Sequence, residues 1–329
     1  MRGLVTVFGG SGFIGSQTVR ALAKQGWRIR VAVRRPWQAY RLRMLGDVGQ
    51  IEIAQANVRL VETVDRALEG AEAVVYAAGT PFESGRQSFE VVRSLGPKAA
   101  AEGAARLGIH NFVFISGIGA TPDAGSKAAR ATAEGEAAVR AAIPGAVILR
   151  PSVVFGPEDA FFNKIAAMAV STPVMPVFGA ATRIQPVFVA DVARAVAAAL
   201  ADPAAAGRTF ELGGPSIYTM RELTELTLAE IGRARPLLPL PWDVAGLIGM
   251  AGDAIAFLRG PLPMLLEPPI TSDQLALMKP DNVVGAGMPG LADLGVAAAA
   301  LEPIIPTYLY RYRKGGQYAD LAPPEALRV

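Results

Sequence analysis

Short apolar segments alternate with helical stretches through the first 155 residues of the chain. The helical stretches carry their hydrophobic positions on one face, whereas the short segments are apolar almost throughout. Continuous apolarity is typical of strands in a parallel sheet, because helices bury both faces of such a sheet. The pattern therefore predicts an α/β fold with a doubly wound parallel sheet. Its predicted strands are 4–8, 28–33, 51–55, 73–77, 112–116 and 146–150.

Beyond residue 155 this alternation ends, because prolines and glycines interrupt the sequence. Further along, the pattern predicts a strand at 210–214 and a helix at 219–232. We expect two domains. The first comprises residues 1–155, and 186–212 returns to it. The second is a smaller, apolar C-terminal domain of residues 156–329.

The C-terminal half contains an apolar predicted helix at 242–258, which includes two aspartates. This helix is shorter than the ~20 residues that crossing a membrane requires. We expect it to lie at a membrane interface, against a partner or over its own domain. Gly246, Gly249 and Gly252 form a smooth strip that permits close approach of another helix. The tail at 308–318 interleaves aromatic and cationic side chains, which suits anionic headgroups, an acidic partner or a fold back onto the domain.

Composition limits the chemistry that the chain can perform. Hydrophobic residues make up 51% of the 329 residues and the mean hydropathy is +0.32, which indicates that another molecule covers some apolar surface. The net charge of +3 is too small to predict nucleic-acid binding. The sequence has no cysteine and only one histidine, His110, which excludes thiolate catalysis and metal sites built on these residues. Since a strand begins at residue 4, we expect no targeting peptide and a cytoplasmic location.

A glycine-rich loop, GGSGFIG, directly follows the first predicted strand. It matches both Gly-x-x-Gly-x-x-Gly and Gly-x-Gly-x-x-Gly. Between a strand and a helix, such a loop lets a pyrophosphate approach the backbone N–H groups at the helix N-terminus. The alternative is a glycine-rich turn without a ligand. The motif predicts a Rossmann-type dinucleotide site formed by Gly9, Gly10, Ser11, Gly12, Phe13, Ile14 and Gly15.

The end of the second strand predicts which dinucleotide is bound. About 20 residues after the loop, NAD-binding proteins place a carboxylate that holds the ribose 2′-hydroxyl. This chain has Arg34 and Arg35 there, and guanidiniums bind the 2′-phosphate that a carboxylate would repel. The sequence therefore favours NADPH over NADH, unless the two arginines only solvate the sheet end. Asn57 is expected at the adenine edge. The small residues expected to lie against the cofactor are Ala77, Ala78 and Gly79.

These features together resemble the short-chain dehydrogenase/reductase superfamily, in its extended or atypical branch. The resemblance also rests on Ser116 after the fifth strand, on PSVVFGP at 151–157 and on FVADVA at 188–193. Members of the superfamily use a serine at this position together with Tyr-x-x-x-Lys on the next helix. The tyrosine transfers the proton while hydride moves to or from the cofactor.

The chain departs from the superfamily at the proton-transfer pair. In SKAARATAEGEAAVR, alignment on the surrounding sequence places Ala128 at the tyrosine and Thr132 at the lysine. The neighbouring Lys127 points to another face of the predicted helix. Tyr310 and Lys314 have the right spacing, but they lie near the C-terminus. Loss of one positioned acid/base group typically costs about 10²–10⁴-fold in rate, so the resemblance implies no ordinary dehydrogenase activity and no catalytic residue.

The wider sequence is similar to the accessory subunit of respiratory complex I (NADH:ubiquinone oxidoreductase) that has this fold, in a bacterial form. The resemblance covers nearly the whole chain, and residues 134–163 are its most specific part. Members bind NADPH tightly without known turnover and dock near the membrane. The resemblance implies other complex I subunits as partners and a peripheral position on the cytoplasmic face of the inner membrane. Thr132 removes a ribose contact that relatives make through lysine. Carried over by position, the cofactor contacts are Gly9, Gly12, Phe13, Ile14, Gly15, Arg34, Arg35, Asn57, Ala78, Ser116, Pro151 and Val153.

Three functions remain open from the sequence. The first is a non-catalytic, NADPH-holding subunit of complex I. The second is an active atypical reductase or sugar-nucleotide epimerase whose acid/base group lies elsewhere. The third is a regulatory protein that senses NADP(H) through a soluble partner. Activity towards a carbonyl or quinone acceptor would favour the second, and a partner that depends on the nucleotide's oxidation state would favour the third.

Overall fold

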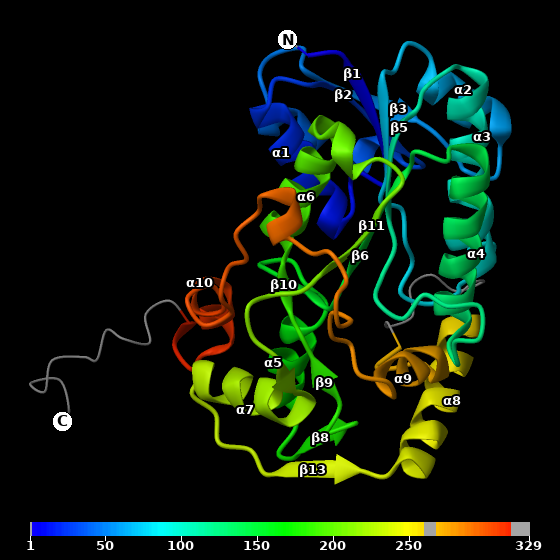
Figure 1. Ribbon diagram of the computed structural model, residues 1–329. Coiled ribbons are helices and arrows are strands. Elements are labelled where there is room, and N and C mark those ends of the chain that lie inside the picture. The colour runs from blue at the N-terminus through cyan, green and yellow to red at the C-terminus, as the bar shows by residue number, and fades with distance from the viewer. Residues whose placement is uncertain (1, 260–267, 317–329) are drawn as a thin grey trace, which may run out of the picture.

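A seven-stranded parallel sheet forms the centre of the computed structural model, which describes residues 2–259 and 268–316 (Figure 1). The strand order is β11-β6-β5-β4-β1-β2-β3, and every pairing between neighbours is parallel. This confirms the predicted Rossmann-type α/β fold. The strands are β1 (Leu4–Phe8), β2 (Arg28–Val33), β3 (Ile51–Gln55), β4 (Ala73–Tyr76), β5 (Asn111–Ile115), β6 (Val147–Pro151) and β11 (Thr209–Leu212).

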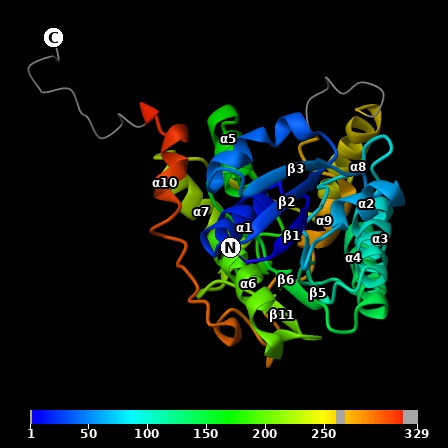
Figure 2. The same ribbon diagram turned by 90° about the horizontal axis from the view of Figure 1, so that it is seen from above.

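Helices cover both faces of this sheet, as Figure 2 shows. On one face α1 packs against α6, and on the other α2, α3 and α4 lie side by side. Each face has its own apolar core, so every residue of the central strands β1 and β4 is buried, whereas in the edge strand β3 only Ile51 is. These helices are α1 (Phe13–Lys24), α2 (Val61–Leu68), α3 (Gly96–Arg106), α4 (Lys127–Ala142) and α6 (Val189–Ala201), and a π-helical turn, η3 (Glu90–Leu95), leads into α3.

The strand order places the crevice that a dinucleotide uses. β1 lies between β2 and β4, so the connections after β1 and β4 run to opposite faces of the sheet. Ligands of open parallel sheets bind at such a switch point, outside the carboxyl ends of the strands. The glycine-rich loop after β1 and the small residues after β4 meet at this edge.

A smaller layer beyond this edge contains short strand pairs and the remaining helices (Figure 1). Its core forms around Phe155, Phe162 and Leu223 and is separate from the two cores of the sheet. The strands pair as β7 (Val154–Phe155) with β10 (Val187–Phe188), β8 (Met175–Phe178) with β13 (Leu237–Leu240), and β9 (Arg183–Ile184) with β12 (Tyr218–Thr219). The helices are α5 (Phe162–Ser171), α7 (Met220–Glu230), α8 (Trp242–Leu258), α9 (Ser272–Met278) and α10 (Pro306–Leu309). Short 3₁₀ helices are Pro36–Gln38, Tyr40–Leu45, Pro203–Ala205, Ala292–Leu294 and Tyr310–Tyr312.

The glycine strip of α8 faces its own chain. A Cβ at Gly252 would lie 1.8 Å from the carbonyl oxygen of Ile270, and one at Gly249 would lie 3.0 Å from the Ser272 backbone. Gly246 has no neighbour within 4 Å of such an atom. The predicted close approach is therefore made by the start of α9, at two of the three glycines.

The C-terminal tail folds back onto the smaller layer, one of the alternatives stated above. The Tyr308 hydroxyl donates to Asp159 Oδ2 at 2.8 Å, and Arg311 Nη2 donates to the Pro157 carbonyl at 2.7 Å. Burial, with Asp159 adding to it, raises the pKa of Tyr308. The rest of the predicted tail, 317–318, lies outside the described residues.

Candidate functional site

The glycine-rich loop has a geometry that only glycine supports at two positions. Gly9 has φ 76°, in the left-handed region, and a Cβ there would lie 2.6 Å from the Ala78 backbone. A Cβ at Gly15 would lie 2.2 Å from the Gly9 carbonyl oxygen. The loop therefore packs tightly between the end of β4 and the first turn of α1, as the close approach of a pyrophosphate requires.

The N-terminus of α1 is open to a ligand. Its N-cap is Gly12, which offers no side-chain acceptor, and the first turn carries no acidic residue. The Gly12 N–H donates to the Gly9 carbonyl at 3.0 Å, which closes the loop beneath the helix. Backbone N–H groups of a first turn have no partner within the helix, and the helix dipole favours an anion beside them. Ser11 lies in the loop, while Phe13 and Ile14 begin the helix.

Three arginines gather where β2 and β3 end. Arg34 and Arg35 follow β2, and Arg59 follows β3. Burial, and then the charges of Arg35 and Arg59, lower the pKa of Arg34, so the guanidiniums of Arg35 and Arg59 lie close enough to Arg34 to repel it. Asn57 Oδ1 accepts from the N–H of Arg59 at 3.2 Å and from its Nε at 3.4 Å. The amide nitrogen of Asn57 thus remains available for an adenine edge.

This cluster is electrostatically unbalanced. Within the described part of the chain, none of the three arginines forms an ion pair with a carboxylate. Like charges held together are costly and favour binding of a phosphate. The sequence gives no sign of the role of Arg59, because its position two residues after Asn57 matches no spacing rule. The parallel pairing of β2 with β3 brings it beside Arg34.

The end of β4 supplies a smooth surface beside the loop. The Ala77 N–H donates to the Phe8 carbonyl at 2.9 Å, which continues the pairing of β4 with β1 beyond the strand end. Ala78 then lies directly against Gly9, and Gly79 has no neighbour within 4 Å of a built Cβ. That these small residues let a cofactor lie against the strand ends stays a prediction.

The two residues that replace the proton-transfer pair, Ala128 and Thr132, lie on α4. Ala128 and Thr132 are both buried, whereas Lys127 is exposed and points elsewhere, as predicted. The Thr132 hydroxyl donates to the Ala128 carbonyl at 2.7 Å and accepts from Arg93 Nη1 at 3.4 Å. A hydroxyl and a methyl group therefore stand where an acid/base pair is needed, and neither can exchange a proton near neutral pH.

Ser116, at the position where superfamily members place a serine, belongs to a largely buried ionic network. Its hydroxyl forms a short hydrogen bond with Glu136 on α4. Arg150 donates to both oxygens of Glu136, at 2.8 and 2.6 Å, and its Nη1 lies 3.7 Å from Glu211. The hydrogen bond to Glu136 is the main reason that the pKa of Arg150 is raised. Glu211 also accepts from the Gly285 N–H at 2.8 Å. The network holds Ser116 as a structural donor, and no spacing in the sequence indicates these contacts.

A cavity of about 910 Å³ extends from the crevice into the smaller layer. Phe13, Pro151 and Val153 line its sheet side, next to Ala128 and Thr132. Its volume lies near the upper end of the ~300–1,000 Å³ of ordinary ligand sites. Phe13, Pro151 and Val153, which were predicted to contact the cofactor, therefore line this cavity.

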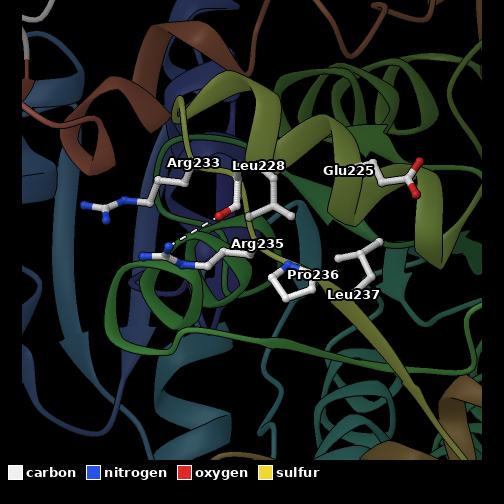
Figure 3. A pocket seen from close by; sticks show the side chains of 7 residues that line it. Glu225, Leu228, Arg233, Arg235, Pro236 and Leu237 are labelled. Carbon is white, nitrogen blue, oxygen red and sulfur yellow. Dashed lines mark hydrogen bonds between the residues drawn. The ribbon is translucent and has the colours of Figure 1, made fainter.

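Figure 3 shows a second pocket, of about 500 Å³, at the end of α7 and the start of β13. Glu225, Leu228 and residues 233–237 line it, and Arg235 Nη1 donates to the Ala234 carbonyl at 3.3 Å. None of the predicted nucleotide-binding residues line this pocket. In residues 2–259 and 268–316, no group of histidine, aspartate and glutamate side chains is arranged to hold a metal ion.

Comparison with known proteins agrees with this geometry. A family described as NAD(P)H-binding matches residues 9–203. The NADH dehydrogenase (ubiquinone) 1 alpha subcomplex subunit 9 of Mus musculus is 32% identical over 302 residues, which cover 91% of this chain and 78% of that protein. A ceramide reductase of Caulobacter vibrioides is 35% identical over 197 residues, which cover 58% of this chain and 59% of that protein.

Among solved structures, the quinone oxidoreductase QOR2 of Escherichia coli in complex with NADPH superimposes with a TM-score of 0.69. The match covers 91% of this chain and 97% of that chain at 20% identity, which shows a shared fold. The match to the NAD(P)H-binding family covers the glycine loop and most of the sheet, and the match to the mouse subunit covers 91% of the chain. The chain therefore belongs to the NAD(P)H-binding family and, within it, to the family of the NADH dehydrogenase 1 alpha subcomplex subunit 9.

Proposed function

We propose that this chain is a non-catalytic accessory subunit of respiratory complex I that holds NADPH as a structural cofactor. The observation that carries the proposal is a complete dinucleotide loop beside a disabled reaction centre. Gly9 and Gly15 keep the close approach that a pyrophosphate needs, whereas Ala128 and Thr132 replace the proton-transfer pair and Ser116 is bound by Glu136. The assignment to complex I rests on the relatives that are named as subunits of NADH dehydrogenase.

The preference for NADPH rests on the arginine cluster of Arg34, Arg35 and Arg59. Burial, and then the charges of Arg35 and Arg59, lower the pKa of Arg34, and the three guanidiniums lack carboxylate partners in the described residues. A 2′-phosphate placed among them would relieve this repulsion, whereas the 2′-hydroxyl of NADH would not. A nucleotide present at ~1,000 times its dissociation constant stabilises the folded chain by about 4 kcal/mol. NADPH would thus act as a stabilising ligand.

The outward face of α8 is the proposed docking surface for the assembly. Leu247, Met250 and Phe257 are 69%, 65% and 78% exposed, although the opposite face of the helix packs on α9. Large apolar side chains exposed in one stripe mark a contact with a partner or a membrane interface. We assign this stripe to complex I at the cytoplasmic face of the inner membrane. No helix in the described residues has the length and apolarity to cross a bilayer.

The test is affinity purification of the tagged chain from detergent-solubilised membranes, with mass spectrometry of the partners and of the nucleotide released on denaturation. We expect subunits of NADH:ubiquinone oxidoreductase and stoichiometric NADPH. Recovery without those subunits would remove the assembly role. Recovery with the subunits but without a nucleotide would remove the cofactor role.

The similarity to a ceramide reductase, together with the cavity beside Ala128, favours an active reductase as the second candidate. Its substrate carbonyl would have to receive a proton from a group other than the missing tyrosine. Rapid oxidation of NADPH by the purified chain in the presence of a long-chain ketone would establish this function and exclude the first one. Absence of turnover by a sample that retains NADPH would exclude the reductase.

A further inference from the structure

The cavity beside the nucleotide crevice is mainly apolar. Its lining comes from the sheet edge, from α5 and from the region of α8 and α9. Apolar side chains that line it include Phe13, Phe82, Phe161, Ile165, Met168 and Met175. Methionine and aromatic side chains adapt to flexible apolar ligands. The cavity is therefore suited to a long hydrocarbon chain.

Most polar side chains of the lining are already occupied within the chain. Ser152, Thr182, Thr224 and Gln274 each donate to an oxygen of another residue, at 2.8–3.1 Å. The remaining charged groups of the lining are Lys164, which is exposed, and Arg93. Arg93 is thus the group that decides which polar end of a ligand the cavity accepts.

Arg93 is a cation without a matching anion. Its Nη2 donates to the Thr80 carbonyl at 2.8 Å and its Nη1 to Thr132 Oγ1 at 3.4 Å, while its buried Nε has no hydrogen-bond partner. No ion pair joins it to a carboxylate of residues 2–259 or 268–316. Burial lowers its pKa, and the charge of Asp273 only partly opposes this effect.

Asp273 is not free to neutralise Arg93, because it caps α4. Its Oδ1 accepts from the Lys127 N–H at 2.5 Å, and its Oδ2 accepts from the Ser126 hydroxyl at 2.8 Å. A buried charge without a partner is costly, and a carboxylate held against it with good hydrogen-bond geometry offsets part of that cost. Arg93 therefore has no carboxylate partner in the described residues, and a ligand is left to supply the anion.

We propose that this cavity binds a single-chain amphiphile with a carboxylate head, of the fatty-acid class. The carboxylate pairs with the guanidinium of Arg93 next to Thr132, and the hydrocarbon chain lies among Ile165, Met168 and Met175. The ligand adjoins the nicotinamide end of the crevice without replacing the dinucleotide. Arg93, on η3, thus places its guanidinium beside Thr132 on α4, the position at which superfamily members have a lysine.

The test measures binding of oleate and of oleyl alcohol to the delipidated full-length chain by isothermal titration calorimetry, with native mass spectrometry for stoichiometry. We expect one oleate per chain and at least tenfold weaker binding of the alcohol. Arg93→Gln should weaken oleate binding at least tenfold and leave the alcohol unchanged. Arg66→Gln, an exposed arginine on α2, should change neither. NADPH content is measured in every sample, so loss of the nucleotide is distinguished from loss of the amphiphile.

A second variant keeps the proposal testable if Arg93→Gln does not fold. Met168→Trp leaves Arg93 in place and fills the cavity, so it should weaken binding of both oleate and the alcohol. Equal binding of oleate by wild type and Arg93→Gln, or unchanged binding by Met168→Trp, would overturn the assignment. Absence of oleate binding by a folded, NADPH-loaded chain would also overturn it.

Discussion

Replacement of Arg150 tests whether the buried network is structural. In Arg150→Met the side chain keeps its apolar contacts, but Glu136 loses both N–H donors, at 2.8 and 2.6 Å, and Glu211 loses its nearby cation. The side chains of Glu136 and Glu211 are only 9% and 10% exposed, against 22% for Arg150. Solvent therefore replaces only part of the lost guanidinium.

The expected loss follows from leaving a buried carboxylate unpaired. Removal of one partner of a buried pair typically costs about 3–5 kcal/mol. Because Arg150 is partly exposed and Glu211 keeps the Gly285 N–H, we expect the lower end, about 3 kcal/mol. For a chain of this size that loss corresponds to a fall in Tm of about 5 °C. The double variant Arg150→Met/Glu136→Gln removes both charges and should recover part of the loss.

Urea unfolding followed by circular dichroism, with bound nucleotide measured in each sample, gives the free energies of unfolding. The matched control is Arg183→Met, since Arg183 pairs with Asp281 at 2.8 Å but is 58% exposed. An exposed pair contributes ~1 kcal/mol or less. If Arg150→Met lowers the free energy of unfolding no more than this control does, the network does not hold Ser116 in the way described. The same follows if adding Glu136→Gln lowers that free energy further.

Three further predictions concern the nucleotide and the docking surface. Arg34→Asp and Arg59→Gln should each weaken NADPH binding at least tenfold and leave NADH binding unchanged, as measured by fluorescence titration. Equal losses of affinity for the two nucleotides would contradict the role of the cluster. Gly9→Ala should abolish nucleotide binding and destabilise the chain by about 1–3 kcal/mol, because its φ of 76° strains any side chain; a normal Tm and NADPH content would refute this. Leu247→Glu and Met250→Glu should leave Tm unchanged, because both side chains are exposed, but should abolish recovery with respiratory subunits. Undiminished recovery would place the docking surface elsewhere.

Much of the sheet and the place of the glycine-rich loop could be predicted from local pattern. The strands recur as apolar runs, because burial on both faces leaves little room for polar residues. A strand followed by a glycine-rich loop and a helix locates the phosphate-binding turn to within a few residues. The replacement of the tyrosine and lysine by Ala128 and Thr132 is visible in the sequence alone, since both positions lie on one helix at a spacing that the sequence displays directly.

The sequence alone therefore determined the fold class, the position of the dinucleotide loop and the absence of the tyrosine–lysine pair. The tertiary structure decided the groups that surround them. Arg59 joins Arg34 because β3 pairs with β2, Glu136 is brought to Arg150 across α4 and β6, and Arg93 reaches Thr132 from another helix. The physical reason is that charge balance and cavity shape depend on contacts between distant segments, and no period or spacing in the chain records those contacts.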